Sequence, residues 1–138
     1  MAPRSYSAVM NTRLFAYLSY RDAPAALDWL AACGFSTVRR IDGDDGRVVH
    51  AEVRHGDAVV IVASNDADYD HAVLVGQPTG HGIYLLVDDV DDIYARAVAA
   101  GATPVIEPED TEWTTRRARV LDLEGIEWSF GSYEPGER

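Results

Sequence analysis

An internal repeat restricts the fold of this chain more than any other feature of its sequence. Residues 17–34 and 84–101 both begin with Tyr-Leu, reach an Asp five positions later and end an Ala-rich run with Gly. One step separates Tyr17 from Tyr84, Asp22 from Asp89, and Gly34 from Gly101 (84 − 17 = 89 − 22 = 101 − 34 = 67). A repeat of this length indicates one supersecondary unit used twice. Two such halves commonly share a cleft, where ligands bind.

Length and composition exclude several classes of protein. The 138 residues fit one domain with its own core. A net charge of −11 argues against binding to nucleic acid or anionic membranes; it is compatible with a cationic ligand, and equally with simple solubility. No apolar run approaches the roughly 18 residues of a membrane helix. The single cysteine, Cys33, excludes an internal disulfide, and the default location for such a chain is the cytoplasm.

Periodicity and turn residues predict the same order of elements in each half. In the first half, Asp22 is a good N-cap and Gly34 a good helix end. In the second half, Asp89 takes the place of Asp22. The predicted strands are 14–20, 35–41, 48–54, 58–63, 82–87, 103–106, 116–121 and 126–131, with helices at 25–32 and 90–100 and a loop at 107–115. The result is an α+β chain of two tandem βαβββ modules.

These elements suggest a simple domain organisation. We expect residues 1–12 to form a disordered leader and residues 13–133 a single domain. Its halves, 13–64 and 81–133, are joined by a loop at 65–80, and residues 134–138 form a polar tail.

Four segments of the sequence carry a resemblance to a known family. They are Leu18 to Leu30, His50 to Asp57, Tyr84 to Gly101, and Trp113 to Gly131, which together span most of residues 14–133. In this order, on an internal repeat, they resemble the vicinal oxygen chelate superfamily of glyoxalases, bleomycin resistance proteins and ring-cleaving dioxygenases. The resemblance implies that the two modules form a shared curved sheet with a central cleft, and that the protein is a homodimer.

The fourth segment departs from the family pattern. Thr114, Leu123 and Ile126 stand where the family usually has Gly, Pro and Asn. Gly125 keeps the turn, so the two strands around it should survive. The loop around Trp113 is expected to differ in shape.

Metal-dependent members of this family hold their ion with residues from the first and last strands of each half. The positions of this sequence that correspond to the family's metal ligands are Phe15, Gly82, Ser129 and either Val60 or Val62. These side chains are not suitable ligands for a divalent ion. We therefore expect no metal at the usual site and no cofactor, and we do not expect ordinary glyoxalase, dioxygenase or thiol-transferase activity. A displaced site would use His50 and Glu52, which share a strand face, with His71 or His81.

The strand alternation gives the walls of the expected cleft. If Phe15 points into it, Tyr17 and Ser19 share its face, whereas Leu14, Ala16 and Leu18 turn toward the helix. Gly82 would leave space where a ligand residue otherwise stands. Trp29, Trp128, Phe130 and Cys33 are expected in the core. The predicted ligand-binding residues are Phe15, Tyr17, His50, Glu52, Tyr84, Trp113, Arg116, Glu127 and Ser129.

Three functions fit this pattern. The first is a metal-independent protein of the bleomycin-resistance type that sequesters a small aromatic or cationic molecule. The second is a lyase, isomerase or dioxygenase-like enzyme that uses a displaced metal or acid–base chemistry through His50 and Glu52. The third is an accessory domain whose cleft is filled by its own aromatic side chains.

Overall fold

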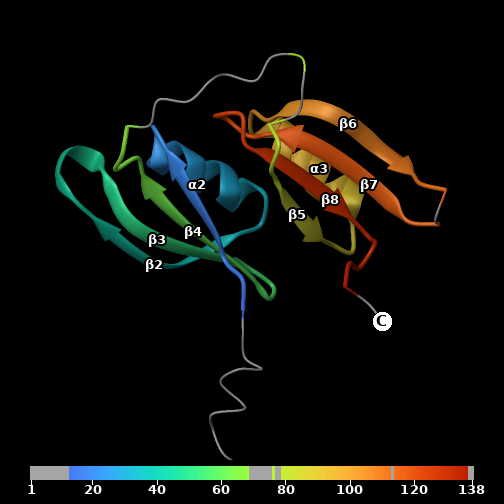
Figure 1. Ribbon diagram of the computed structural model, residues 1–138, viewed down its shortest axis with the longest axis horizontal. Coiled ribbons are helices and arrows are strands. Elements are labelled where there is room, and N and C mark those ends of the chain that lie inside the picture. Colours follow the sequence, from blue (N-terminus) through green and yellow to red (C-terminus); the bar gives the residue numbers. More distant parts are fainter. Residues whose placement is uncertain (1–12, 69–75, 77–78, 113, 137–138) are drawn as a thin grey trace, which may run out of the picture.

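The computed structural model describes residues 13–68, 76, 79–112 and 114–136 and contains two halves of the same design (Figure 1). The first half comprises β1 (Ala16–Tyr20), α2 (Ala23–Ala32), β2 (Ser36–Asp42), a short 3-10 turn η1 (Asp44–Gly46), β3 (Val48–His55) and β4 (Ala58–Ser64). The second half comprises β5 (Ile83–Leu86), α3 (Val90–Ala99), β6 (Thr103–Asp110), β7 (Arg116–Leu121) and β8 (Glu127–Gly131). The predicted α+β fold of tandem βαβββ modules is confirmed.

The strands form two four-stranded sheets rather than one shared sheet. Their orders are β1-β4-β3-β2 and β5-β8-β7-β6, so the first strand of each half lies at an edge and pairs in parallel with the last. The other neighbours pair antiparallel. Hydrogen bonding within each half therefore corrects the expectation of a single continuous sheet. Figure 1 shows the two sheets side by side, with the helices toward the middle of the molecule.

Local signals place most element ends correctly. The Asp22 side chain accepts a hydrogen bond from the backbone N–H of Ala25, and Asp89 caps α3 in the same way. One boundary is wrong at β1, where Leu14 precedes the strand and is 97% exposed instead of facing the helix. Another is wrong at β6, which continues through the predicted loop to Asp110 because it pairs with the start of β7.

One core lies between the helices and the inner faces of the sheets. Trp29 of α2 donates a 3.1 Å hydrogen bond from Nε1 to the carbonyl of Ala97 in α3. Its ring lies 5.7 Å from that of Trp128 on β8, which also contacts Phe35. Trp29, Trp128, Phe130 and Cys33 are all buried, as predicted. The aromatic side chains of one half therefore complete the core of the other.

The turn between β7 and β8 ties the halves together through a buried carboxylate. Asp122 accepts hydrogen bonds from the Tyr20 hydroxyl and the Trp128 indole, and from the backbone N–H groups of Glu124 and Ile126. The Glu124 carboxylate in turn accepts two 2.8 Å bonds from the backbone of Arg21 and Asp22. Buried charges need such partners, and here the partners come from both halves.

Several expectations lie outside the described residues: the leader at 1–12, His71 and most of the predicted loop at 65–80, and Trp113. Within the described part of the chain, neither helix is long and apolar enough to cross a bilayer.

Candidate functional site

The candidate site is built on the faces of the two sheets that point away from the helices, here called the outer faces. Register places four residues in one row across the first sheet, Tyr17, Ile61, Glu52 and Arg39. It places four in the matching row across the second, Tyr84, Ser129, Arg119 and Ile106. Because Tyr17 and Tyr84 are repeat partners, the rows are equivalent in the two halves.

Tyr17 and Tyr84, two of the aromatic residues predicted for the cleft, are on these outer faces. Phe15, Tyr17 and Tyr84 are 42%, 54% and 40% exposed, whereas their inward neighbours Leu18 and Leu85 are buried. The alternation predicted for β1 and β5 is therefore confirmed. Large exposed apolar side chains gathered on one face commonly mark an interaction site.

Two of these aromatic residues, one from each half, line the same cavity. A space of about 450 Å³ lies between the start of β1, the start of β4 and β5, with Phe15 and Tyr84 in its wall. The Arg13 guanidinium lies 5.1 Å from the centre of the Phe15 ring. This volume is in the range that small organic ligands occupy.

Tyr84 is held in a fixed position beside this cavity. Its hydroxyl donates a 2.5 Å hydrogen bond to the carbonyl of Tyr133. Its ring lies against the backbone of Gly131, where an added Cβ would come within 2.8 Å of Tyr84 Cε1. Burial raises the pKa of the Tyr84 hydroxyl above its usual value. Tyr84 also lines two further cavities, one of about 530 Å³ beside Thr111 and Thr115, and one of about 790 Å³ beside Cys33.

His50 and Glu52 form a pair on the outer face of the first sheet. His50 Nε2 lies 2.7 Å from Glu52 Oε2, and both side chains are about one-third exposed, at 33% and 35%. The predicted sharing of one strand face is confirmed. A carboxylate that orients an imidazole is an arrangement used in general acid–base chemistry.

The second sheet carries a matching polar group that includes a residue the sequence analysis missed. Arg119 Nε donates a 3.0 Å hydrogen bond to Ser129 Oγ and lies 3.3 Å from Glu127 Oε2. Glu127 and Ser129 were predicted, but Arg119 was not. The alternation of β7, which buries Ala118 and Val120, was the available signal that its neighbour faces outward.

The structure also corrects the role given to Gly82. A Cβ at this position would lie 3.0 Å from the carbonyl oxygen of Glu127 and 3.3 Å from its Cβ. The space into which a side chain at this position would project is therefore taken by β8, although Gly82 itself lines the cavity of about 450 Å³.

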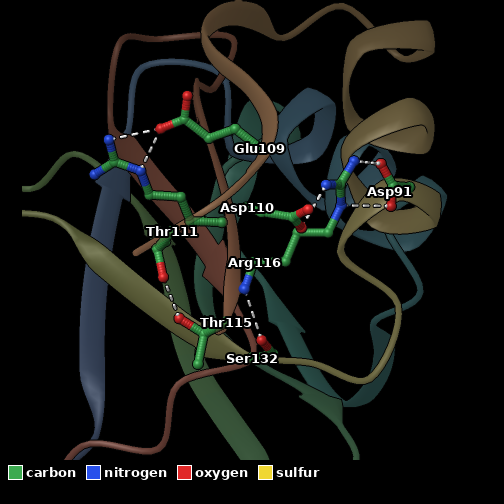
Figure 2. Close-up of polar contacts among 8 residues, drawn as sticks. Asp91, Glu109, Asp110, Thr111, Thr115, Arg116 and Ser132 are labelled. Atoms are coloured by element: carbon green, nitrogen blue, oxygen red, sulfur yellow. Dashed lines mark hydrogen bonds and ion pairs between the residues drawn. The ribbon is translucent and has the colours of Figure 1, made fainter. Parts of the chain in front are cut away.

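Arg116 shares the wall of the cavity of about 530 Å³ with Tyr84, and its guanidinium lies between Asp91 and Asp110 (Figure 2). The side chains of Arg116 and Arg117 point to opposite faces of β7, and Arg116 shares the inner face with Ala118. Its guanidinium makes two 2.9 Å hydrogen bonds to Asp91 of α3 and a third to Asp110 of β6. These bonds raise the pKa of Arg116 and lower that of Asp91. These contacts give Arg116 a structural role, as a link between α3 and the sheet, and its ligand-binding role stays a prediction.

The residues at the family's metal positions do not fit a metal ion. Register places Ile61, not Val60 or Val62, opposite Tyr17 and in the place that Ser129 takes in the second half. Val60 and Val62 are buried in the core instead. The positional set is then Phe15, Ile61, Gly82 and Ser129, which offers one hydroxyl oxygen, already bonded to Arg119. Among the described residues, no three His, Cys, Asp or Glu side chains gather to hold an ion elsewhere.

Comparison with known proteins agrees with this architecture. Residues 13–130 match the Glyoxalase/Bleomycin resistance protein/Dioxygenase superfamily. The chain belongs to this superfamily.

Relatives extend over most of the chain. It is 34% identical over 121 residues to the uncharacterized protein Rv0887c of Mycobacterium tuberculosis, covering 83% of this chain and 71% of that protein. The solved structure of TioX from Micromonospora sp. ML1 is similar with a TM-score of 0.71 and 31% identity, over 90% of this chain and 100% of TioX. A bleomycin resistance determinant encoded on the transposon Tn5 shares the fold, with a TM-score of 0.62 and 18% identity, over 90% of this chain and 99% of that one.

Proposed function

We propose that this protein binds a small, flat organic molecule, aromatic or cationic, without the help of a metal ion, in the manner of a sequestration or resistance protein. The observation that carries the proposal is the cavity of about 450 Å³ that Phe15 and Tyr84, one from each half, both line. Aromatic walls bind flat ligands by burial and by ring stacking. Glu52 and Glu127, the two acidic residues predicted for the site, lie on the outer faces beside His50 and Arg119 and would attract a cationic substituent.

The donor set supports a metal-independent mode of binding. The positions that hold the ion in metal-dependent relatives carry two apolar side chains, a glycine and a hydroxyl that already accepts a hydrogen bond. Divalent ions need several nitrogen, sulfur or oxygen ligands in one place.

We further propose that the protein is a homodimer. Exposed apolar side chains outside the cavity, such as Val38, Leu86 and Val105, would be covered by a second copy. Two-fold dimers are the most common assemblies of soluble proteins.

Binding of a neutral fluorescent probe, N-phenylnaphthylamine, tests the site. Replacing Tyr17 or Tyr84 by Ala should weaken binding at least about twofold, since each aromatic contact contributes roughly 0.5–1.5 kcal/mol. Leu123→Ala, which removes an exposed apolar side chain beside Gly101, is the control and should leave affinity unchanged. Circular dichroism should show all three variants folded. Unchanged affinity in both tyrosine variants would refute the site.

Native mass spectrometry at neutral pH tests the absence of a bound metal ion and the homodimer. A dimer without metal, before and after zinc, iron, manganese and nickel are offered, is expected. A stoichiometric ion would contradict metal-independent binding, and a monomer would contradict the dimer.

A second candidate function is acid–base catalysis, favoured by the 2.7 Å contact of His50 and Glu52. In that case a compound bound at this face would be converted, and its mass or absorbance would change on incubation with the protein. His50→Ala would abolish the change but keep binding. A bound compound recovered unaltered from the wild-type protein favours sequestration.

A further inference from the structure

The polar group on the second outer face has donors that the protein does not use. In the part of the chain that the structure describes, the hydrogen bond of Arg119 is made by Nε, to Ser129, and its two terminal nitrogens donate none. The Arg119 side chain is 34% exposed, so it is neither buried in the core nor fully solvated. A guanidinium in this setting presents a planar fork of N–H groups, which matches a carbonyl, carboxylate, phenolate or sulfonate oxygen.

Arg119 is oriented by its neighbours. Ser129 fixes Nε from one side, and Glu127, only 17% exposed, balances the charge at 3.3 Å. A side chain held in this way loses little conformational freedom when a ligand binds.

The position of Arg119 relative to Tyr84 sets the size of the ligand. Both belong to one row, with Ser129 between them. Two strand spacings separate their backbones, which is roughly 10 Å. The Tyr84 ring lies over Gly131, two residues along β8 from Ser129, so it leaves the part of the row between Tyr84 and Arg119 uncovered. A flat molecule of two or three fused or linked rings spans this distance.

The repeat places groups of opposite charge at one pair of equivalent positions in the two rows. Arg119 occupies the row position that Glu52 occupies in the first half. The first outer face thus offers a carboxylate beside an imidazole, and the second a guanidinium. Such a pair of walls favours a ligand with a donor or cationic group at one end and an acceptor oxygen at the other.

We infer that Arg119 is a specificity-determining residue of the proposed site, which recognises an acceptor or anionic oxygen on an aromatic ligand stacked on Tyr84. This inference rests on the proposed function and deepens it, because it names a chemical group that the ligand must carry.

Two probes with the same ring system separate this inference from the proposed function. Anilinonaphthalene sulfonate carries an anionic oxygen group, and N-phenylnaphthylamine lacks it. Arg119→Gln should weaken binding of the sulfonate about tenfold or more, as expected for a hydrogen bond between charged groups, and change binding of the neutral probe less than about twofold.

Arg117→Gln is the matched control. Arg117 lies on the same strand and the same face, but its guanidinium is engaged by Glu109 at 2.7 Å. This variant removes the same charge and should leave both affinities unchanged. Arg119→Gln leaves the Glu127 carboxylate without its ion pair, which could make the single variant fold poorly. The double variant Arg119→Gln, Glu127→Gln removes both charges and keeps the test valid in that case. It should also lose the preference for the sulfonate.

The outcomes are distinct. Selective loss of sulfonate binding in the Arg119 variants supports the inference. Equal sulfonate affinity in wild type and both Arg119 variants, or a selective loss in Arg117→Gln, overturns it and leaves the proposed function standing. If the wild-type protein binds neither probe, the proposed function fails and the inference fails with it.

Discussion

The Tyr20 hydroxyl donates a 2.7 Å hydrogen bond to Asp122 Oδ2 across the junction of the two halves. Tyr20 ends β1 and Asp122 begins the turn after β7, so the bond joins segments 102 positions apart in the chain. Both side chains are buried. The relative placement of the two outer faces, and hence the site between them, depends on this contact and its neighbours.

Tyr20→Phe should destabilise the fold by about 1–3 kcal/mol, because it removes a buried hydrogen bond to a carboxylate and leaves the ring in place. Urea unfolding measures the change. Tyr94→Phe is the matched control, since the Tyr94 hydroxyl donates no hydrogen bond within the described residues and should change stability little. Equal effects of the two changes would show that the Tyr20–Asp122 bond contributes nothing of its own.

Gly131→Ala should displace the Tyr84 ring. The new Cβ would meet the ring well inside van der Waals distance, and overpacking of this kind costs about 1–3 kcal/mol. N-phenylnaphthylamine should also bind more weakly. In a Tyr84→Ala background the clash is absent, so the same substitution should cost much less. An equal cost in both backgrounds would contradict the placement of the ring over Gly131.

Stability should fall at alkaline pH. Burial raises the pKa of the Cys33 thiol from 9.0 to about 12, and burial beside Asp122 raises that of Tyr20. Between pH 9.0 and about 12, Cys33 loses its thiol proton in the unfolded chain and keeps it in the folded protein. The stability present below about pH 9 is therefore lost as the pH rises toward about 12.

Urea midpoints at about pH 7 and about pH 10.5 measure this loss, and Cys33→Ala with Tyr20→Phe should reduce it. A thiol reagent gives an independent reading. It should label the folded protein far more slowly than the unfolded chain, and labelling at equal rates would contradict the burial of Cys33.

Arg116→Gln should lower the melting temperature and leave probe affinity unchanged, since its three hydrogen bonds connect α3, β6 and β7 (Figure 2). The same change should return the pKa of Asp91 toward its ordinary value of 3.8, which NMR titration can follow. A large loss of probe binding in a variant with unaltered stability would restore Arg116 to the binding site.

Periodicity predicted the fold well because both halves obey simple local rules. Asp22 and Asp89 cap their helices, and the alternation in β1 and β5 separates exposed Tyr17 and Tyr84 from buried Leu18 and Leu85. Local rules failed where pairing between strands determines the end of a strand or the direction of a side chain. β6 is extended by its partner strand, and Ile61 rather than its neighbours faces outward because of its register with Tyr17.

The candidate site was predicted less completely for the same reason. Glu127 and Ser129 were recognised, but Arg119 comes beside them only through the pairing of β7 with β8. Arg116 has a sequence context like that of Arg117 and Arg119, and only its contact with Asp91 assigns it a different role. Contacts between distant segments were not visible in the composition of any one segment.

The distribution of charge has a kinetic consequence. The chain carries a net charge of −11, yet register places four arginines and three glutamates on the outer faces: Arg39, Arg54, Arg117, Arg119, Glu52, Glu109 and Glu127. An anionic ligand is repelled by the whole molecule at long range and attracted only once it reaches Arg119. Added salt, by screening the long-range field more than the short contact, would speed the arrival of such a ligand while changing its residence time much less.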